Sequence, residues 1–464
     1  MDVNTVVVGG GIAGLAAADR IAEKLGPGSL LLLEAAPRLG GKISTIKTDG
    51  FVIEGGPDCF LASKPGGIEL CRRLGIDHRI VGTSPTNRRS YVRRARRLHE
   101  LPDGISGLVP SRLLPLMRTS LLSVPGRLRA ALELFVPPRR GGNEETIAAF
   151  ASRRFGREAY DWLIEPLLGG IYAGDGGSLS LDATFPQLRQ VESQHGGVLR
   201  AMLRRRTNGE RNHAGPGFVT LRGGLAEIVE ALASRLAGRW RTGTAAVSAR
   251  RDGSRWVVRL DDGTLVTCDN LIVATPSFAA ADLIGETDAA LADELRAIPF
   301  TGTVTVTVGL RREAVPRPLD GYGYVSPRAE GGDIVACTWT SNKFPTRSPQ
   351  DRVLLRYFIG RSGRADATAA DDAALKALVR EELAAMHGIR EEPSLWRIFR
   401  WPRGMPQYTL GHGSRVSRIE RRAAALPGFA LAGASYRGVG IPDCITSGWK
   451  AADQVATRAT AGRV

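Results

Sequence analysis

The stretch TVVVGGGIAGLAAADRIAEKLGPGSLLLLEA, residues 5–35, constrains the fold most strongly. An apolar strand runs into Gly9, Gly11 and Gly14, an alanine-rich helix follows, and a second apolar strand ends at Glu34. The first glycine allows a tight turn, the second lets the backbone approach a pyrophosphate, and the third lets the helix pack close to the strand. The acid is placed to accept hydrogen bonds from a ribose hydroxyl. This spacing predicts a dinucleotide site at the start of a Rossmann-like α/β domain.

A second glycine turn follows directly in APRLGGKIST, residues 36–45. The doublet Gly40–Gly41 can bring backbone amides to a phosphate, and Arg38 and Lys42 add positive charge beside it. This second phosphate turn favours FAD over NAD as the dinucleotide.

The stretch WVVRLDDGTLVTCDNLIVATPS, residues 256–277, favours FAD as well. Its Asp262–Gly263 pair marks a β-hairpin, and the buried strand after it leads to Ala274. A β-meander that returns to the sheet late in the sequence is typical of two-domain flavoproteins. No second GxGxxG unit for NAD(P)H occurs. We therefore expect the organic substrate to reduce the flavin and an acceptor such as oxygen to reoxidise it, as in an oxidase or a desaturase.

A strand, a glycine-rich turn and a helix are predicted close to the C-terminus. The strand covers residues 430–433, Gly438 and Gly440 keep the turn small, and Pro442 fits the first turn of a helix that starts near Asp443. This helix of about four turns would point its positive end at the flavin and stabilise negative charge on the reduced ring. The alternative is a plain C-terminal helix that packs on the core.

The composition limits the class of protein. A chain of 464 residues is expected to form two or three domains. The formal net charge of +16 favours an anionic partner, a polycarboxylate substrate or a lipid surface, because no nucleic-acid module is recognisable. The scattered cysteines form no CxxC pair, which argues against a structural zinc site and fits a reducing cytoplasm. No signal peptide or transmembrane run is predicted, since a strand begins by Thr5 and every apolar stretch is short.

The middle of the chain allows two interpretations. Residues 105–135 are apolar, with arginines every few residues and prolines between short helices. This segment could lie in a membrane interface with its arginines at the headgroups, or it could be a helical subdomain packed on the core. Helices continue over residues 144–168. Residues 301–310 and 353–359 read as strands of a second sheet, and residues 372–387 read as an amphipathic helix.

The predicted fold is therefore of the α/β class, with a discontinuous Rossmann-like FAD-binding domain, a mixed-sheet substrate domain and a helical insertion. The predicted division is 1–75, 213–290 and 416–464 for the FAD-binding domain, 76–104 and 291–415 for the substrate domain, and 105–212 for the helical insertion, which is also the candidate membrane-facing part.

Four further motifs carry a resemblance to a known family. EPLLGGIYAGD (165–175), RWPRGMPQYTLGH (400–412) and YRGVGIPDCITSG (436–448) resemble the oxygen-dependent porphyrinogen oxidases of haem synthesis, FAD-containing members of the flavin amine oxidase superfamily. GPDCFLASK (56–64) is similar to the GPxxFLAxK stretch of the coproporphyrinogen-type enzymes. The resemblance extends over essentially the whole chain.

The resemblance implies a reaction as well as a fold. It implies oxidation of coproporphyrinogen III to coproporphyrin III, with protoporphyrinogen IX as the alternative substrate and a flavin amine oxidase as a more remote alternative. A carotenoid desaturase and an FAD-binding structural or sensor protein are further alternatives. Six electrons would leave the macrocycle in three hydride transfers to flavin N5, and oxygen would accept these electrons and be reduced to hydrogen peroxide. No metal and no catalytic side chain is implied, and His412 is a weak candidate for an acid or base.

The resemblance, together with the glycine turns, also implies the site residues. The FAD, held non-covalently, would contact Gly9, Gly10, Gly11, Ile12, Ala13, Gly14, Glu34, Ala35, Arg38, Gly40, Gly41, Lys42, Gly55, Gly56, Pro57, Asp58, Val247, Trp401, Val439, Gly440, Ile441 and Pro442. The anionic porphyrinogen would pair a propionate with Lys64, unless that residue is an ordinary surface lysine. Ile171, Val325 and Phe358 would make apolar contacts to the macrocycle, unless they are simply core residues. The expected location is the cytoplasm, with peripheral contact at the inner face of the membrane left open.

Overall fold

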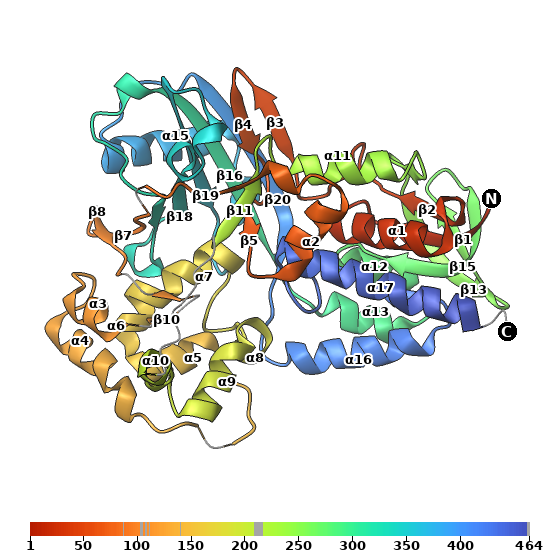
Figure 1. Ribbon diagram of the computed structural model, residues 1–464, viewed down its shortest axis with the longest axis horizontal. Coiled ribbons are helices and arrows are strands. Elements are labelled where there is room, and N and C mark those ends of the chain that lie inside the picture. Colours follow the sequence, from red (N-terminus) through yellow and green to blue (C-terminus); the bar gives the residue numbers. More distant parts are fainter. Residues whose placement is uncertain are drawn as a thin grey trace.

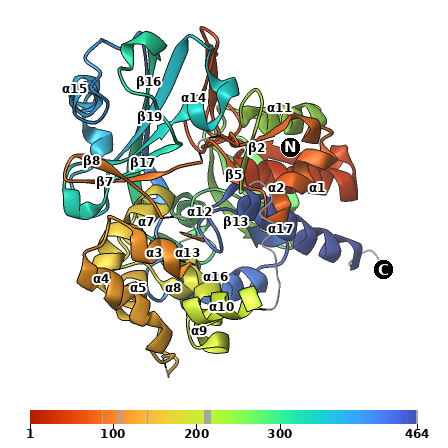
Figure 2. The same ribbon diagram turned by 60° about the vertical axis from the view of Figure 1, so that its left-hand side comes forward.

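The computed structural model describes residues 1–86, 88–102, 105–106, 109–110, 112–139, 141–207 and 217–461. Figure 1 shows three parts: an α/β part that holds both chain ends, a second sheet with helix α15 beside it, and a group of helices from α3 to α10. In the turned view of Figure 2 the second sheet lies above the helical group, and the α/β part lies beside both.

The first sheet is built from segments that are far apart in the sequence. Its strands follow the order β12-β2-β1-β15-β14-β13, and β21 also pairs with β15. They cover Trp240–Arg241 (β12), Leu30–Leu33 (β2), Asp2–Val8 (β1), Leu265–Val273 (β15), Arg255–Leu260 (β14), Ala246–Asp252 (β13) and Phe429–Leu431 (β21). Strand β1 is parallel to β2 and β15, and β15 is parallel to β21. Strands β13, β14 and β15 form the predicted antiparallel meander.

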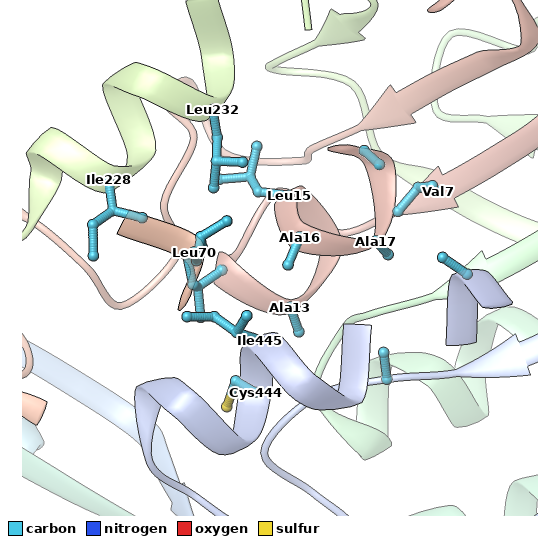
Figure 3. Close-up of a cluster of buried hydrophobic side chains, with 14 of the residues drawn as sticks. Val7, Ala13, Leu15, Ala16, Ala17, Leu70, Ile228, Leu232, Cys444 and Ile445 are labelled. Carbon is cyan, nitrogen blue, oxygen red and sulfur yellow. The ribbon is translucent and has the colours of Figure 1, made fainter. Parts of the chain in front are cut away.

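Helices cover both faces of this sheet. One apolar core, drawn in part in Figure 3, joins it to α1 (Ile12–Leu25), α2 (Pro65–Arg73), α11 (Ala226–Arg235) and α17 (Ile441–Ala461). A second core joins it to α12 (Ser277–Ile284), α13 (Ala289–Arg296) and α16 (His412–Ala425). Helix α17 approaches α1 closely because residue 448 is glycine: a Cβ on Gly448 would lie 2.1 Å from the carbonyl oxygen of Ala13. The two ends of the chain are thus packed against each other.

The second sheet has the strand order β20-β16-β19-β18-β17-β7-β8. Its strands are Leu395–Pro406 (β20), Phe300–Arg311 (β16), Arg352–Ile359 (β19), Ile334–Trp339 (β18), Gly323–Val325 (β17), Tyr91–Arg94 (β7) and Arg97–Glu100 (β8). Side chains alternate between the faces of a sheet, so Val304, Val306 and Val308 join the core that α15 (Asp372–Glu382) shares. Thr305 points the other way and donates a hydrogen bond of 3.1 Å to the carbonyl of Gly55 in the α/β part.

The helical group has a core of its own. Its helices are Leu113–Arg118 (α3), Val124–Ala131 (α4), Ile147–Phe155 (α5), Arg157–Ala159 (α6), Glu165–Tyr172 (α7), Leu181–Thr184 (α8), Pro186–His195 (α9) and Val198–Thr207 (α10). A fully buried ion pair lies inside it, where Arg154 Nε donates to Glu133 Oε1 over 2.9 Å. Glu133 also accepts from the backbone amides of Val198 and Leu199, so the carboxylate ties three helical segments together.

The remaining strands are short and form three small sheets. They are Thr45–Thr48 (β3), Phe51–Glu54 (β4), Phe60–Leu61 (β5), Ile80–Gly82 (β6), Ile105–Ser106 (β9), Val109–Pro110 (β10) and Phe218–Leu221 (β11). Strands β3 and β4 form a hairpin, and β11 lies between β5 and β6.

The predicted α/β class and the predicted elements of the second sheet are confirmed, with corrections at the C-terminus. Helix α17 begins at Ile441 rather than near Asp443 and has 21 residues, so it is longer than four turns. The predicted helix 372–387 is α15 followed by a π-helical turn, Leu383–His387. The junction expected between residues 212 and 213 lies outside the described residues, and the domain division stays a prediction. Among the described residues no helix is both long and apolar enough to cross a membrane.

Candidate functional site

The first glycine turn leaves open space at one position only. Gly9 has a φ of +107°, and a Cβ on Gly14 would lie 1.8 Å from the carbonyl oxygen of Gly9, so both must be glycine for the turn and the helix to pack. Gly11 differs, since its φ is −71° and a Cβ there would meet nothing within 4 Å. Room at the start of α1, where helix amides are free, fits the pyrophosphate of a dinucleotide.

Glu34 is held firmly at the end of β2. Its Oε2 accepts a 2.6 Å hydrogen bond from the amide of Gly10, and its Oε1 accepts a 2.8 Å bond from the amide of Ala36. Ala35 lies between Glu34 and Ala36 in the chain. The carboxylate therefore lies beside the first glycine turn, where the motif predicts it.

The second glycine turn packs on the first. The amide of Gly40 donates to the carbonyl of Gly10 over 2.8 Å, and a Cβ on Gly41 would lie 3.2 Å from Cα of Gly11. Arg38 does not point away as a free cation, because its guanidinium donates to the Gly41 carbonyl over 2.7 Å. Burial lowers the pKa of the Lys42 ammonium from its ordinary value. The structure thus brings the two predicted phosphate turns together.

The turn that begins at Gly55 lies between the α/β part and the second sheet. A Cβ on Gly56 would lie 1.8 Å from the carbonyl oxygen of Lys42, so this turn packs directly on the second glycine turn. Trp401 of β20 donates from Nε1 to the Gly55 carbonyl over 3.0 Å. Pro57 follows in the same turn. Residues predicted from two distant motifs are therefore in contact.

Asp58 has a partner that the sequence did not reveal. Lys343, the last residue of α14 (Thr340–Lys343), places Nζ 3.0 Å from Asp58 Oδ2. Burial alone would raise the pKa of Asp58, but the charges of Lys343 and Arg356 outweigh it and hold that pKa below the usual range of an aspartate. The neighbouring Cys59 is a poor nucleophile, because burial and the Asp58 charge raise the pKa of its thiol to about 12.

Two aromatic side chains hold the C-terminal turn. Tyr408 accepts a 2.8 Å hydrogen bond from the amide of Gly438 and donates a 2.6 Å bond to the carbonyl of Ala434. His412 stacks on Tyr408 with ring centroids 4.0 Å apart and bonds the carbonyl of Tyr436. Burial lowers the pKa of His412, so the ring is neutral at pH 7. Through these contacts His412 helps to hold the C-terminal turn in place.

The C-terminal turn leads into α17 through Val439, Gly440, Ile441 and Pro442. Gly440 needs no positive φ, whereas Gly438 has a φ of +150°. Asp443 folds back over the turn and accepts a 3.3 Å hydrogen bond from the Gly440 amide. The start of α17 is therefore fixed by a carboxylate, which also suits the positive end of a helix.

Lys64 is paired within the protein. Its Nζ donates to both oxygens of Asp443, over 2.8 and 2.6 Å, across 379 positions of sequence. The Lys64 side chain remains 45% exposed, and an ammonium has three donors. Lys64 is therefore a fixed cation with a donor to spare, rather than a freely moving surface lysine.

Two of the candidate substrate contacts, Val325 and Phe358, share one face of the second sheet. Val325 pairs with Ala336, and Ala336 pairs with Phe358, so the three form a row across β17, β18 and β19. Ile171 of α7 is 41% exposed, next to Gly170, where a Cβ would lie 4.0 Å from Val325. Val247 lies apart from this row on β13, where it is exposed.

The comparisons with known proteins agree with this geometry. A family model for flavin containing amine oxidoreductases matches residues 12–456. The coproporphyrinogen III oxidase of Bacillus subtilis (strain 168) is 37% identical over 464 residues, covering 98% of each chain. The chloroplastic protoporphyrinogen oxidase of Oryza sativa subsp. japonica is 29% identical over 98% of this chain and 88% of that protein. A crystal structure from Exiguobacterium sp. 255-15, assigned by name to the protoporphyrinogen oxidases, has a TM-score of 0.87 and 31% identity over 98% of this chain and 99% of that one.

No group of three or more histidine, cysteine, aspartate or glutamate side chains in the described ranges could hold a metal ion. The glycine turns, the meander and the full-length matches confirm the predicted fold class and the resemblance. The chain belongs to the flavin containing amine oxidoreductase family, in its branch of porphyrinogen oxidases.

Proposed function

We propose that the protein oxidises coproporphyrinogen III to coproporphyrin III, with oxygen as acceptor and hydrogen peroxide as the second product. The full-length identity of 37% to the Bacillus subtilis coproporphyrinogen III oxidase carries this proposal. Protoporphyrinogen IX is the second candidate substrate, favoured by the relative from Oryza sativa. FAD supplies the redox chemistry when bound, by taking two electrons as a hydride at N5 in each of three rounds.

The chain's own residues bind and orient the cofactor and the substrate. We propose non-covalent FAD on the two glycine turns, with Glu34 at the ribose, Lys42 near the phosphates, and the turns at Gly55 and Val439 around the flavin. The closest support is the open space at Gly11. No side chain is assigned as general base, so placement of the substrate beside the cofactor supplies most of the catalysis.

We propose that the porphyrinogen lies along the row of Val325 and Phe358, with Ile171 above it and a propionate on Lys64. The exposure of Ile171 and the spare donor of Lys64 support this placement. Asp443 would keep the ammonium at one position while the propionate uses the remaining N–H.

The test is anaerobic mixing of the yellow protein with coproporphyrinogen III, protoporphyrinogen IX or a primary amine. We expect coproporphyrinogen III to bleach the flavin absorbance fastest, and admission of oxygen to restore it with release of hydrogen peroxide. Faster bleaching by protoporphyrinogen IX would reverse the order of the two substrates. Bleaching by the amine alone would overturn the proposal.

We also propose peripheral contact with the inner face of the cytoplasmic membrane through α4 and the turn after it. Val124, Leu128, Leu132 and Phe135 are all more than half exposed, and their spacing places them on one helical face. Other residues of the predicted segment, such as Leu116, are buried in the helical core. Vesicles with anionic lipid should bind the protein at low salt and release it at high salt. A Phe135→Ser variant that binds as well as the wild type would contradict this contact.

A further inference from the structure

One backbone carbonyl in the structure receives hydrogen bonds from three strands of the second sheet. Thr305 Oγ1 of β16 lies 3.1 Å from the carbonyl oxygen of Gly55, and Trp401 Nε1 of β20 lies 3.0 Å from it. Arg356 Nη2 of β19 lies 3.4 Å from the same oxygen and also donates to the carbonyl of Gly56. We call Thr305, Arg356 and Trp401 the Gly55 clamp.

The strand register explains why these three side chains converge. Strand β16 is flanked by β20 and β19 in the sheet. Thr303 pairs with Trp401, and Thr307 pairs with Arg356, so Thr305 lies between the two on the central strand. Positions that differ by two residues share a face. All three donors therefore point from one face toward the turn at Gly55.

Glycine is required at the target of the clamp. A Cβ on Gly55 would lie 2.6 Å from the ring of Phe399, the residue that pairs with Thr305 on β20. The turn thus lies directly on the sheet, and its carbonyl is fixed from below. Movement of this turn would break several hydrogen bonds at once.

The buried position of the Arg356 side chain is unfavourable for folding. The side chain is 2% exposed, and its Nε and Nη1 have no hydrogen-bond partner in the described part of the chain. Burial lowers the pKa of its guanidinium, although the charges of Asp58 and Glu54 oppose this. A buried charge that is only partly satisfied destabilises a fold, and such groups call for a reason other than stability. Its contacts supply one, because Nη2 joins two successive carbonyls of the turn.

We propose that Thr305, Arg356 and Trp401 are positioning residues, which fix the height of the Gly55 turn, and thus of the flavin, above the row of Val325 and Phe358. This inference rests on the proposed function for the flavin's contact with that turn. Phe358 lies under Arg356, with the guanidinium 4.7 Å from its ring centroid, so the clamp and the row share a side chain contact. Hydride transfer is sensitive to such placement, since an error of about 1 Å can cost about 100-fold in rate.

The sharpest test compares two threonines of one strand. Thr305→Val removes the hydroxyl bonded to Gly55 and keeps the shape of the side chain. Thr307→Val is the matched control, because Thr307 lies on the same face, is equally buried, and its hydroxyl has no partner in the described structure. We expect Thr305→Val to slow anaerobic flavin reduction by coproporphyrinogen III about 2- to 10-fold, the equivalent of one hydrogen bond. Thr307→Val should reduce at the wild-type rate.

A second pair of variants gives an independent readout. Trp401→Phe removes the indole donor, and Trp396→Phe is its control, because Trp396 is on the same strand and donates instead to Glu392 over 3.1 Å. Visible circular dichroism of the bound flavin should change in Trp401→Phe and Thr305→Val but not in the two controls. Arg356→Lys should retain more of the wild-type rate of flavin reduction than Arg356→Met.

The outcomes are distinguishable from those of the proposed function. If Thr305→Val and Trp401→Phe keep both the wild-type reduction rate and the wild-type dichroism, the clamp does not position the flavin. If the wild-type protein binds FAD but coproporphyrinogen III does not reduce it, the proposed function fails. The dichroism of the four variants still tests the clamp in that case. A fall in thermal stability with neither readout changed would leave the clamp a purely structural contact and overturn the inference.

Discussion

Gly11→Val separates cofactor binding from folding, because the protein itself does not require a glycine at this position. The backbone there is extended, with φ −71° and ψ 174°, and a Cβ would meet nothing within 4 Å. Valine at this helix N-cap should therefore change the free energy of unfolding of the flavin-free protein by about 1 kcal/mol or less. The same side chain would occupy space that the pyrophosphate needs, so FAD binding should be abolished.

The expected loss of stabilisation by FAD follows from ligand linkage. FAD at 100 times its Kd should raise the free energy of unfolding of the wild type by about 2.7 kcal/mol, and this increment should vanish in Gly11→Val. Gly14→Ala is the matched control. Its Cβ would lie 1.8 Å from the carbonyl oxygen of Gly9, so it should cost about 3 kcal/mol or more with or without FAD.

The assay is urea unfolding of the flavin-free proteins followed by far-ultraviolet circular dichroism, together with an FAD titration followed by quenching of flavin fluorescence. Full flavin content in Gly11→Val would place the pyrophosphate elsewhere and refute the reasoning. Loss of folding in flavin-free Gly11→Val would show that the glycine serves the backbone after all.

Three further predictions concern charged and titratable groups. Lys64→Ala should raise KM for coproporphyrinogen III several-fold, about the effect of 1 kcal/mol, and leave kcat nearly unchanged. Asp443→Asn should raise KM as well, because it removes the charge that holds Lys64. Unchanged steady-state constants in both variants would show that the pair is merely structural. Arg154→Met should lower the free energy of unfolding by about 3 to 5 kcal/mol, because it leaves the buried Glu133 carboxylate without its partner. Urea denaturation measures this loss, and the double variant Arg154→Met with Glu133→Gln shows how much of it comes from the unpaired carboxylate. Burial lowers the pKa of His387 to about 4, so the unfolded chain takes up the proton first as the pH falls below about 6.5. Stability should fall between these values, and His387→Phe should flatten that slope; equal slopes in both proteins would show that other groups titrate there.

The glycine motifs could be interpreted from the sequence because each glycine has a local cause. Gly9 needs a positive φ, Gly14 needs contact with the preceding turn, and Gly11 needs room, and all three causes act within six residues. The meander was equally local, since its hairpin turns at Gly263 with a φ of +84°. Such local features can be recognised from the sequence without knowledge of the tertiary structure.

The partners of the charged residues could not be predicted. Lys64 meets Asp443, and Asp58 meets Lys343, across 379 and 285 positions, and neither pairing leaves a periodic signal in the sequence. The Gly55 contacts depend on the register of β16, which only the assembled sheet fixes. The start of α17 was predicted two residues late, because the glycine-rich turn of Gly438 and Gly440 leads directly into the helix.

The pairing of α1 with α17 has a consequence for how the chain matures. Strand β1 is made long before its partner β15, which begins 263 positions later, and β21 and α17 follow β15 in turn. Until then the side of α1 that packs on α17 has no cover and part of β15 presents an open edge, and such exposed surfaces favour aggregation. The first glycine turn and α1 therefore gain the cover of α17 long after they themselves have been made.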